Sequence, residues 1–270
     1  MRARPLLVLL PLLGVLFACD STSPPPPQQF PNLLQRGDTW TYDVRFTERP
    51  VDSSAVDTLL ATRARMQVVE TGVTLGGRSG LVELAVFPLS APDSIDRTWY
   101  QQSPDSLVDV AYTTPIRVSG TLPLSRDKLR QRSAPPSQGL THLPLLVRRH
   151  VGASASKAGA DTTVRSDSRV VLQAPLDPGA TWTSFRDPFL NVRTVVGDTT
   201  LETPAGRFEA VEIETSLPEL APSLQWTDYV GPSGLAKRVV TDTVERRDDT
   251  GTRMTPTVTR EVYTLTDKRN

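Results

Sequence analysis

The chain has 270 residues with 30 basic and 30 acidic side chains, so its formal net charge is zero. A near-neutral chain gives no support for a nucleic-acid-binding surface or for a surface that binds anionic membranes. Its 24 prolines, together with abundant threonine and valine, argue for short strands and many turns. The composition therefore excludes a protein built from long helices and favours a mainly β fold.

The start of the chain is typical of a secretory signal. Arg2 and Arg4 supply a positive first region, and residues 6–18 are almost entirely apolar. This apolar run is too short to span a bilayer and matches the hydrophobic region of a signal peptide. We therefore expect residues 1–18 to be a signal peptide.

Cys19 is the only cysteine of the chain and follows the apolar run directly. The stretch Leu16-Phe17-Ala18-Cys19 resembles the bacterial lipobox, in which a leucine and a small residue precede an invariant cysteine. The resemblance implies cleavage after Ala18 and acylation of Cys19, and acyl chains contribute about 0.8 kcal/mol of membrane binding per buried methylene. The alternative is an ordinary secretory signal with an accidental cysteine near the cleavage site.

The acylated cysteine and a proline-rich linker occupy residues 19–32, where DSTSPPPPQQ follows the cysteine. Serine, proline and glutamine cannot build a core, and consecutive prolines favour an extended polyproline II conformation. We interpret this segment as a spacer between the membrane and a single β-rich domain over residues 33–270.

Residues 40–48 show the clearest strand pattern. Trp40, Tyr42, Val44 and Phe46 alternate with polar residues, which predicts a strand with one buried face. Residues 65–73 and 80–88 are separated by glycines that fit a hairpin turn. Further strands are predicted over residues 97–103, 106–114, 169–175, 181–187, 192–203, 206–216, 224–231, 235–247 and 256–266.

Helix signals are few. Residues 30–34, 125–133 and 216–224 are each expected to form at most a short helix. Residues 120–168 interrupt the strand rhythm and are rich in Ser, Ala, Gly, Pro and Arg. We expect an irregular central insertion there, with residues 152–163 mobile.

The two halves of the chain resemble each other. The sequence around Trp40 returns around Trp182, and the pairing continues through later strands, so that residues 37–119 match residues 179–266. An internal duplication is one interpretation. Convergence is the other, because any antiparallel meander places glycine turns between valine-rich strands.

Three motifs of the second half carry a family resemblance. They are Gly179-Ala180-Thr181-Trp182, the stretch TPAGRF at residues 203–208, and the stretch YVGPSGLAK at residues 229–237. Together they resemble uncharacterised bacterial envelope proteins, many of them lipoproteins, with PLxxGxTW, TPAGxF and VGxxGLxK motifs. The resemblance covers most of the mature chain and implies a fold similar to the half-barrel of outer-membrane lipoprotein carriers. It provides no catalytic residue.

Few residues suggest chemistry. His142 and His150 are eight positions apart in an irregular segment, which is a weak case for a metal site. Glu212 and Glu214 share one strand face and are expected to form its wet side, opposite Val211 and Ile213. No nucleophile elbow, phosphate loop, zinc-protease motif or dinucleotide fingerprint occurs. We therefore predict no catalytic residue, no metal ligand and no cofactor, and expect that the protein is not an enzyme.

Two further features have a structural and a functional interpretation. Trp40 and Trp182 are expected in the core or at its edge, with the rim of an apolar cavity as the alternative. The one basic cluster is expected to be a solvated loop, with contact to lipid phosphates or a partner as the alternative. It comprises Lys128, Arg130, Arg132, Arg148, Arg149 and His150.

The predicted fold class is mainly β, a curved antiparallel sheet, half-barrel-like, with few short helices. The predicted function is that of a non-enzymatic, extracytoplasmic lipoprotein of the bacterial envelope. Acyl chains on Cys19 would hold it on a membrane, facing the periplasm or the outside. One hypothesis is that the concave sheet binds a lipid or another apolar ligand. The alternative is a structural or interaction module with a filled core, no ligand and an envelope protein as partner.

Overall fold

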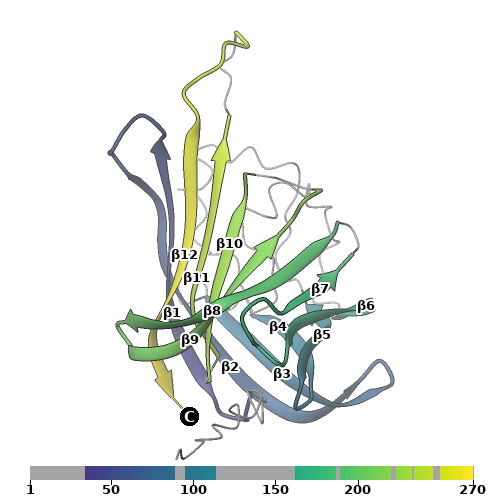
Figure 1. Ribbon diagram of the computed structural model, residues 1–270. Helices are drawn as coiled ribbons and strands as arrows, with labels where there is room; N and C mark the ends of the chain where they lie inside the picture. Colours follow the sequence, from purple (N-terminus) through teal and green to yellow (C-terminus); the bar gives the residue numbers. More distant parts are fainter. Residues whose placement is uncertain are drawn as a thin grey trace, which may run out of the picture.

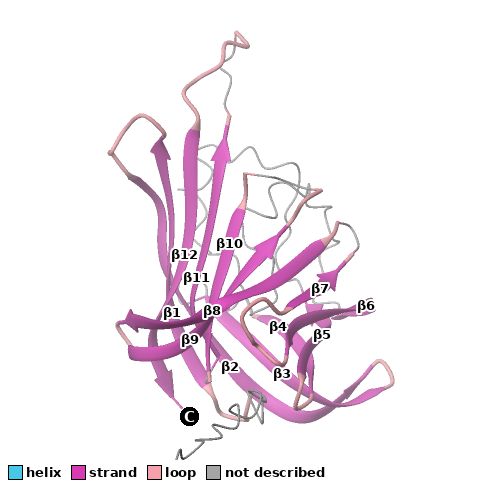
Figure 2. Ribbon diagram, viewed as in Figure 1, coloured by secondary structure: helices cyan, strands magenta, loops and turns pink. Residues whose placement is uncertain are grey.

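The fold comes from a computed structural model of the chain (Figure 1). The structure describes residues 34–88, 95–113, 162–186, 189–219, 223–232, 234–245 and 250–269. No described residue belongs to a helix, as Figure 2 shows. Most of the described chain is strand.

The strands of the described ranges form one antiparallel sheet (Figures 1 and 2). Their bounds are β1 Thr39–Pro50, β2 Asp57–Leu75, β3 Arg78–Pro88, β4 Asp96–Gln102, β5 Ser106–Thr113, β6 Thr162–Gln173, β7 Thr181–Phe185, β8 Asn191–Thr203, β9 Gly206–Ser216, β10 Gln225–Gly231, β11 Gly234–Val244 and β12 Thr257–Arg269. Their order across the sheet is β6-β5-β4-β3-β2-β1-β12-β11-β10-β9-β8-β7. The first half of the chain therefore forms one side of the sheet, and the second half forms the other.

The sheet curls until its two edge strands, β6 and β7, lie beside each other. The predicted curved antiparallel sheet is confirmed, and it curls further than a half-barrel, into a nearly closed barrel-like sheet. Two strands far apart in the sequence, β1 and β12, pair in the middle of the strand order.

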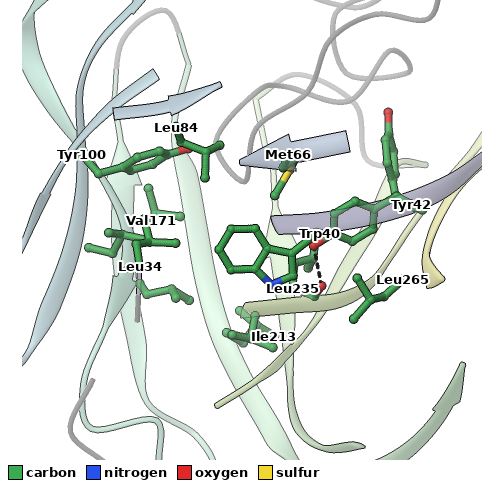
Figure 3. Close-up of a cluster of buried hydrophobic side chains, with 14 of the residues drawn as sticks. Leu34, Trp40, Tyr42, Met66, Leu84, Tyr100, Val171, Ile213, Leu235 and Leu265 are labelled. Carbon is green, nitrogen blue, oxygen red and sulfur yellow. Dashed lines mark hydrogen bonds between the residues drawn. The ribbon is translucent and has the colours of Figure 1, made fainter. Parts of the chain in front are cut away.

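The interior is apolar along much of the barrel. Trp40, Tyr42, Val44 and Phe46 of β1 are all buried on its inward face, as their alternation predicts. Figure 3 shows side chains from strands all round the sheet meeting around Trp40. They include Leu34, Met66, Leu84, Tyr100, Val171, Ile213, Leu235 and Leu265. Burial of each large apolar side chain contributes roughly 1.5–3 kcal/mol, so this cluster is a main source of stability.

The predicted glycine hairpin joins β2 to β3. Gly76 and Gly77 have φ values of 57° and 78°, and Leu75 pairs with Arg78 on either side of them. Two consecutive residues with positive φ are what a tight two-residue hairpin requires, and glycine adopts that conformation without a steric penalty. The hairpin prediction is confirmed.

The two halves of the chain begin with matching turns. Gly37 N donates to Val68 O at 3.0 Å, and Gly179 N donates to Val195 O at 2.8 Å. Each valine donates back to the carbonyl of the residue after the glycine, at 2.9 Å in both turns. The two glycines have φ values of 97° and 87°. The two similar sequence segments around Gly37 and Gly179 therefore form equivalent turns. The internal duplication itself stays a prediction.

Two local predictions differ from the structure. The short helix expected over residues 216–224 is wrong where it is described, because Ser216 ends β9 opposite Val192 and a turn follows. The mobile segment expected over residues 152–163 ends earlier than predicted, since Thr162 and Thr163 belong to β6 and pair with β5. The helices expected over residues 30–34 and 125–133 lie outside the described residues, apart from Leu34.

Candidate functional site

Most of the residues singled out in the sequence lie outside the described ranges. These are Cys19, His142, His150 and the basic cluster. Glu212 and Glu214 are described and lie on the wetter face of β9. Glu212 is half-buried and Glu214 is exposed, while Val211 and Ile213 are buried. The prediction of a wet strand side is confirmed for this pair.

No helix in the described residues has the length and apolar character needed to cross a membrane. No group of three or more His, Cys, Asp or Glu side chains in the same ranges is arranged to hold a metal ion.

All four tryptophans are buried. Trp40, Trp99, Trp182 and Trp226 are between 2% and 6% exposed, so the core interpretation of Trp40 and Trp182 is confirmed. The indole of Trp182 also donates across the gap between the sheet edges, from Nε1 to Val170 O at 3.2 Å. A tryptophan predicted as a packing residue thus also links β7 to β6.

A second part of the interior is charged, and its centre is Asp228 of β10. Its carboxylate accepts hydrogen bonds from Arg238 Nε at 2.6 Å and Arg238 Nη2 at 2.9 Å, and also from Arg193 Nη2. Trp226 Nε1 donates to the same carboxylate at 2.9 Å. Arg193, Asp228 and Arg238, which we call the buried triad, are each at most 4% exposed. Several hydrogen bonds to a charged group offset the cost of burying it.

Burial and the close contacts within the buried triad shift the pKa values of its three side chains. Burial by itself raises the pKa of Asp228, but Arg238 and then Arg193 outweigh burial and the net pKa is lowered. Burial lowers the pKa of Arg238, yet the Asp228 charge outweighs it and the net pKa is raised. For Arg193, burial dominates and lowers the pKa, against the opposing charge of Asp228. Asp228 is therefore a carboxylate held firmly in its ionised form.

Arg193 links the triad to the gap between β6 and β7, which we call the open seam. Its Nε donates to Thr215 Oγ1 at 3.2 Å, and its Nη1 donates to Val171 O. The pairing of β6 with β5 shifts register between Val170 and Leu172, so that Val171 is an extra residue in a β-bulge. The carbonyls of Val170 and Val171 at this bulge are the ones that accept from Trp182 and Arg193. Side chains therefore hold the open seam together.

A small recess of about 20 Å³, room for about one water molecule, lies at the open seam. Its lining residues come from β6, β7, β8 and β10. They are Arg169, Val171, Ser184, Phe185, Asn191, Arg193 and Trp226. The recess combines aromatic walls with two guanidinium groups, an amide and a hydroxyl. We call it the seam recess and treat it as the candidate binding site.

No polar residue of the seam recess was predicted from the sequence. One signal was present, because Trp226, Asp228 and Val230 alternate and place an aspartate on the inward face of β10. An inward aspartate needs a buried cation as partner. The identity of that cation depends on which strands meet, which the local pattern does not encode.

No protein-family model matches the chain, and no curated protein matches it. Two solved structures are similar. One is a Bacteroides fragilis protein described as exported, with a YmcC-like fold; it is 13% identical, with a TM-score of 0.39, over 90% of this chain and 100% of that one. The other is a Parabacteroides distasonis protein described as a lipoprotein; it is 10% identical, with a TM-score of 0.33, over 90% of this chain and 97% of that one. At these values, neither structure carries an argument about function.

Proposed function

We propose that this chain is a non-enzymatic lipoprotein of the bacterial cell envelope, tethered to a membrane through acyl chains on Cys19. Its β domain serves there as a structural or interaction module whose partner is another envelope component. The signal-like residues 1–18 and the Leu16–Cys19 motif support the tether. The spacer over residues 19–32 would hold the domain away from the lipid surface.

The filled interior is the observation that favours a structural or interaction module over a lipid carrier. A carrier of acyl chains needs an apolar cavity of several hundred Å³. The described interior instead holds its own side chains, with Trp40, Tyr100 and Ile213 at 2%, 0% and 0% exposure. The seam recess is the opposite of an acyl site in character, because two guanidinium groups line it. These observations favour the filled-core hypothesis over the apolar-ligand hypothesis.

Cell fractionation of the full chain and of Cys19→Ser tests the tether. We expect the natural chain in the membrane fraction and the variant in the soluble fraction, because only the natural chain would carry acyl groups. An unchanged distribution of Cys19→Ser would contradict the lipoprotein proposal.

Native mass spectrometry of the released Cys19→Ser protein, expressed in a bacterium, tests the module against the carrier. We expect the mass of the polypeptide alone. Co-purified acyl species on the folded protein would instead favour the apolar-ligand hypothesis and would overturn the filled-core choice.

A further inference from the structure

The walls of the seam recess carry two buried polar atoms that lack a hydrogen-bond partner among the described residues. They are Arg169 Nε on β6 and Asn191 Oδ1 on β8. The Asn191 side chain belongs to a residue that is only 1% exposed. Leaving a buried polar atom without a partner is costly, and in native proteins ordered water commonly satisfies such atoms.

The size of the seam recess fits one water molecule. Its volume of about 20 Å³ exceeds the roughly 10–15 Å³ that one water needs, and it leaves no room for a ligand with several non-hydrogen atoms. Purely apolar cavities stay dry. Here, however, polar side chains share the lining with Val171, Phe185 and Trp226, so the recess is suited to water.

Charge also favours a neutral molecule over an ion. Arg169 stands opposite Asp109 in the pairing of β5 with β6. Burial lowers the pKa of Arg169 and the charge of Arg165 lowers it further, while the charges of Asp109 and Asp167 act in the opposite direction. The guanidinium thus already has carboxylates acting on it. Its Nε lacks a hydrogen-bond acceptor, not a counter-ion.

A water molecule matches the polar lining chemically. The N–H at Arg169 Nε can only donate and Asn191 Oδ1 can only accept, whereas a water does both. Ser184 of β7, which is 8% exposed, adds a hydroxyl group to the same lining. Buried waters typically make about three hydrogen bonds, and these three side chains supply three polar groups.

We propose that the seam recess holds one structural water molecule that joins β6 to β8 across the open seam. The water accepts a hydrogen bond from Arg169 Nε and donates one to Asn191 Oδ1, and the Ser184 hydroxyl is its third partner. This water adds a further polar link to the two side-chain bonds that already cross the open seam.

This site goes beyond the proposed role as an envelope module and does not depend on the acyl anchor. Loss of the water would leave the fractionation result unchanged, and loss of membrane attachment would leave the seam recess intact. The two proposals can therefore fail separately.

A crystal structure of the released Cys19→Ser protein, at a resolution that shows ordered waters, tests the proposal. We expect one water in the seam recess, within about 2.7–3.2 Å of both Arg169 Nε and Asn191 Oδ1. A recess without a water would overturn the proposal, and so would a water that contacts only one of these two atoms.

Water-17O magnetic relaxation dispersion, which counts long-lived buried waters, tests the same site in solution. Asn191→Leu keeps a side chain of similar size but removes the acceptor, so the count should fall by one. The matched control is Gln101→Leu, which replaces an amide on the exposed face of β4 and should leave the count unchanged. An unchanged count in folded Asn191→Leu would contradict the site. If Asn191→Leu fails to fold, the crystal structure decides on its own.

Discussion

The barrel-like sheet has two places where the halves of the chain meet, and they are built differently. At the first, β1 and β12 form a long antiparallel ladder that runs from Thr39 opposite Arg269 to Pro50 opposite Thr257, with one register shift after Thr41. At the open seam, no ladder pairing joins β6 to β7 in the described ranges, and side chains of Trp182 and Arg193 bond to backbone carbonyls instead. The two meeting places are thus closed in different ways, β1–β12 by backbone pairing and β6–β7 by side chains.

Strand length explains the difference. β1 has 12 residues, whereas β7, which occupies the corresponding place in the second half, has only 5. A strand this short cannot supply the backbone groups for a long ladder. At the open seam the interior is closed by arginine and tryptophan, which can reach across a gap and donate hydrogen bonds. As a consequence, charged side chains are buried there, and the seam recess lies beside them.

Loss of the central carboxylate should be the most damaging change at the open seam. Asp228→Asn removes the carboxylate charge that both buried guanidinium groups contact, and breaking a buried ion pair in this way costs about 3–5 kcal/mol. Urea denaturation should show this loss in the free energy of unfolding. The matched control is Asp43→Asn, because Asp43 pairs with the exposed Arg63 at 2.9 Å and exposed pairs contribute at most about 1 kcal/mol. Equal effects of the two variants would contradict the importance of the buried triad.

The same carboxylate should make stability depend on acid pH. The pKa of Asp228 is lowered in the folded protein, so the unfolded chain binds more protons in the window below the unfolded value of about 3.9. Its contribution is fully present above about pH 4 and is lost as the pH falls through the folded pKa. Unfolding free energies measured from pH 7 to pH 2 should fall less steeply on the acid side in Asp228→Asn. Parallel acid limbs in the two proteins would contradict this assignment.

The tryptophan link across the open seam should have a smaller effect. Trp182→Phe keeps an aromatic ring but removes the hydrogen bond to Val170 O, which is worth about 0.5–1.5 kcal/mol. Trp99→Phe is the matched control: Trp99 is equally buried, at 6%, but its Nε1 has no hydrogen-bond partner among the described residues. Removing that N–H should cost less. A Trp99→Phe variant less stable than Trp182→Phe would show that packing, not the link, sets the cost.

The sequence predicted the sheet well because period-two alternation is a local signal. Trp40 to Phe46 shows it plainly, and so do the strands that flank the Gly76-Gly77 turn. The first part of β6 was missed because Thr162 to Ser168 contains little apolar sequence, and most of these residues are exposed in the structure. That segment is a strand through its pairing with β5, not through its own pattern.

The candidate site could not be predicted in the same way. Asp228, Arg193 and Arg238 lie on three different strands, and Arg193 is 35 residues away from Asp228 in the sequence. Arg169 joins Asn191 in one recess only because the sheet curls until β6 reaches β7. Curvature and closure are properties of the whole sheet, so no local pattern places these residues together.

Hydrogen exchange of the backbone amides, followed by mass spectrometry on the natural chain, tests the contrast between the two meeting places most directly. A long ladder protects amides until large-scale unfolding, whereas an edge held by side chains opens locally. We predict that peptides from β1 and β12 exchange slowly and that peptides from β6 and β7 exchange much faster. Equal protection of β7 and β1 would contradict the account.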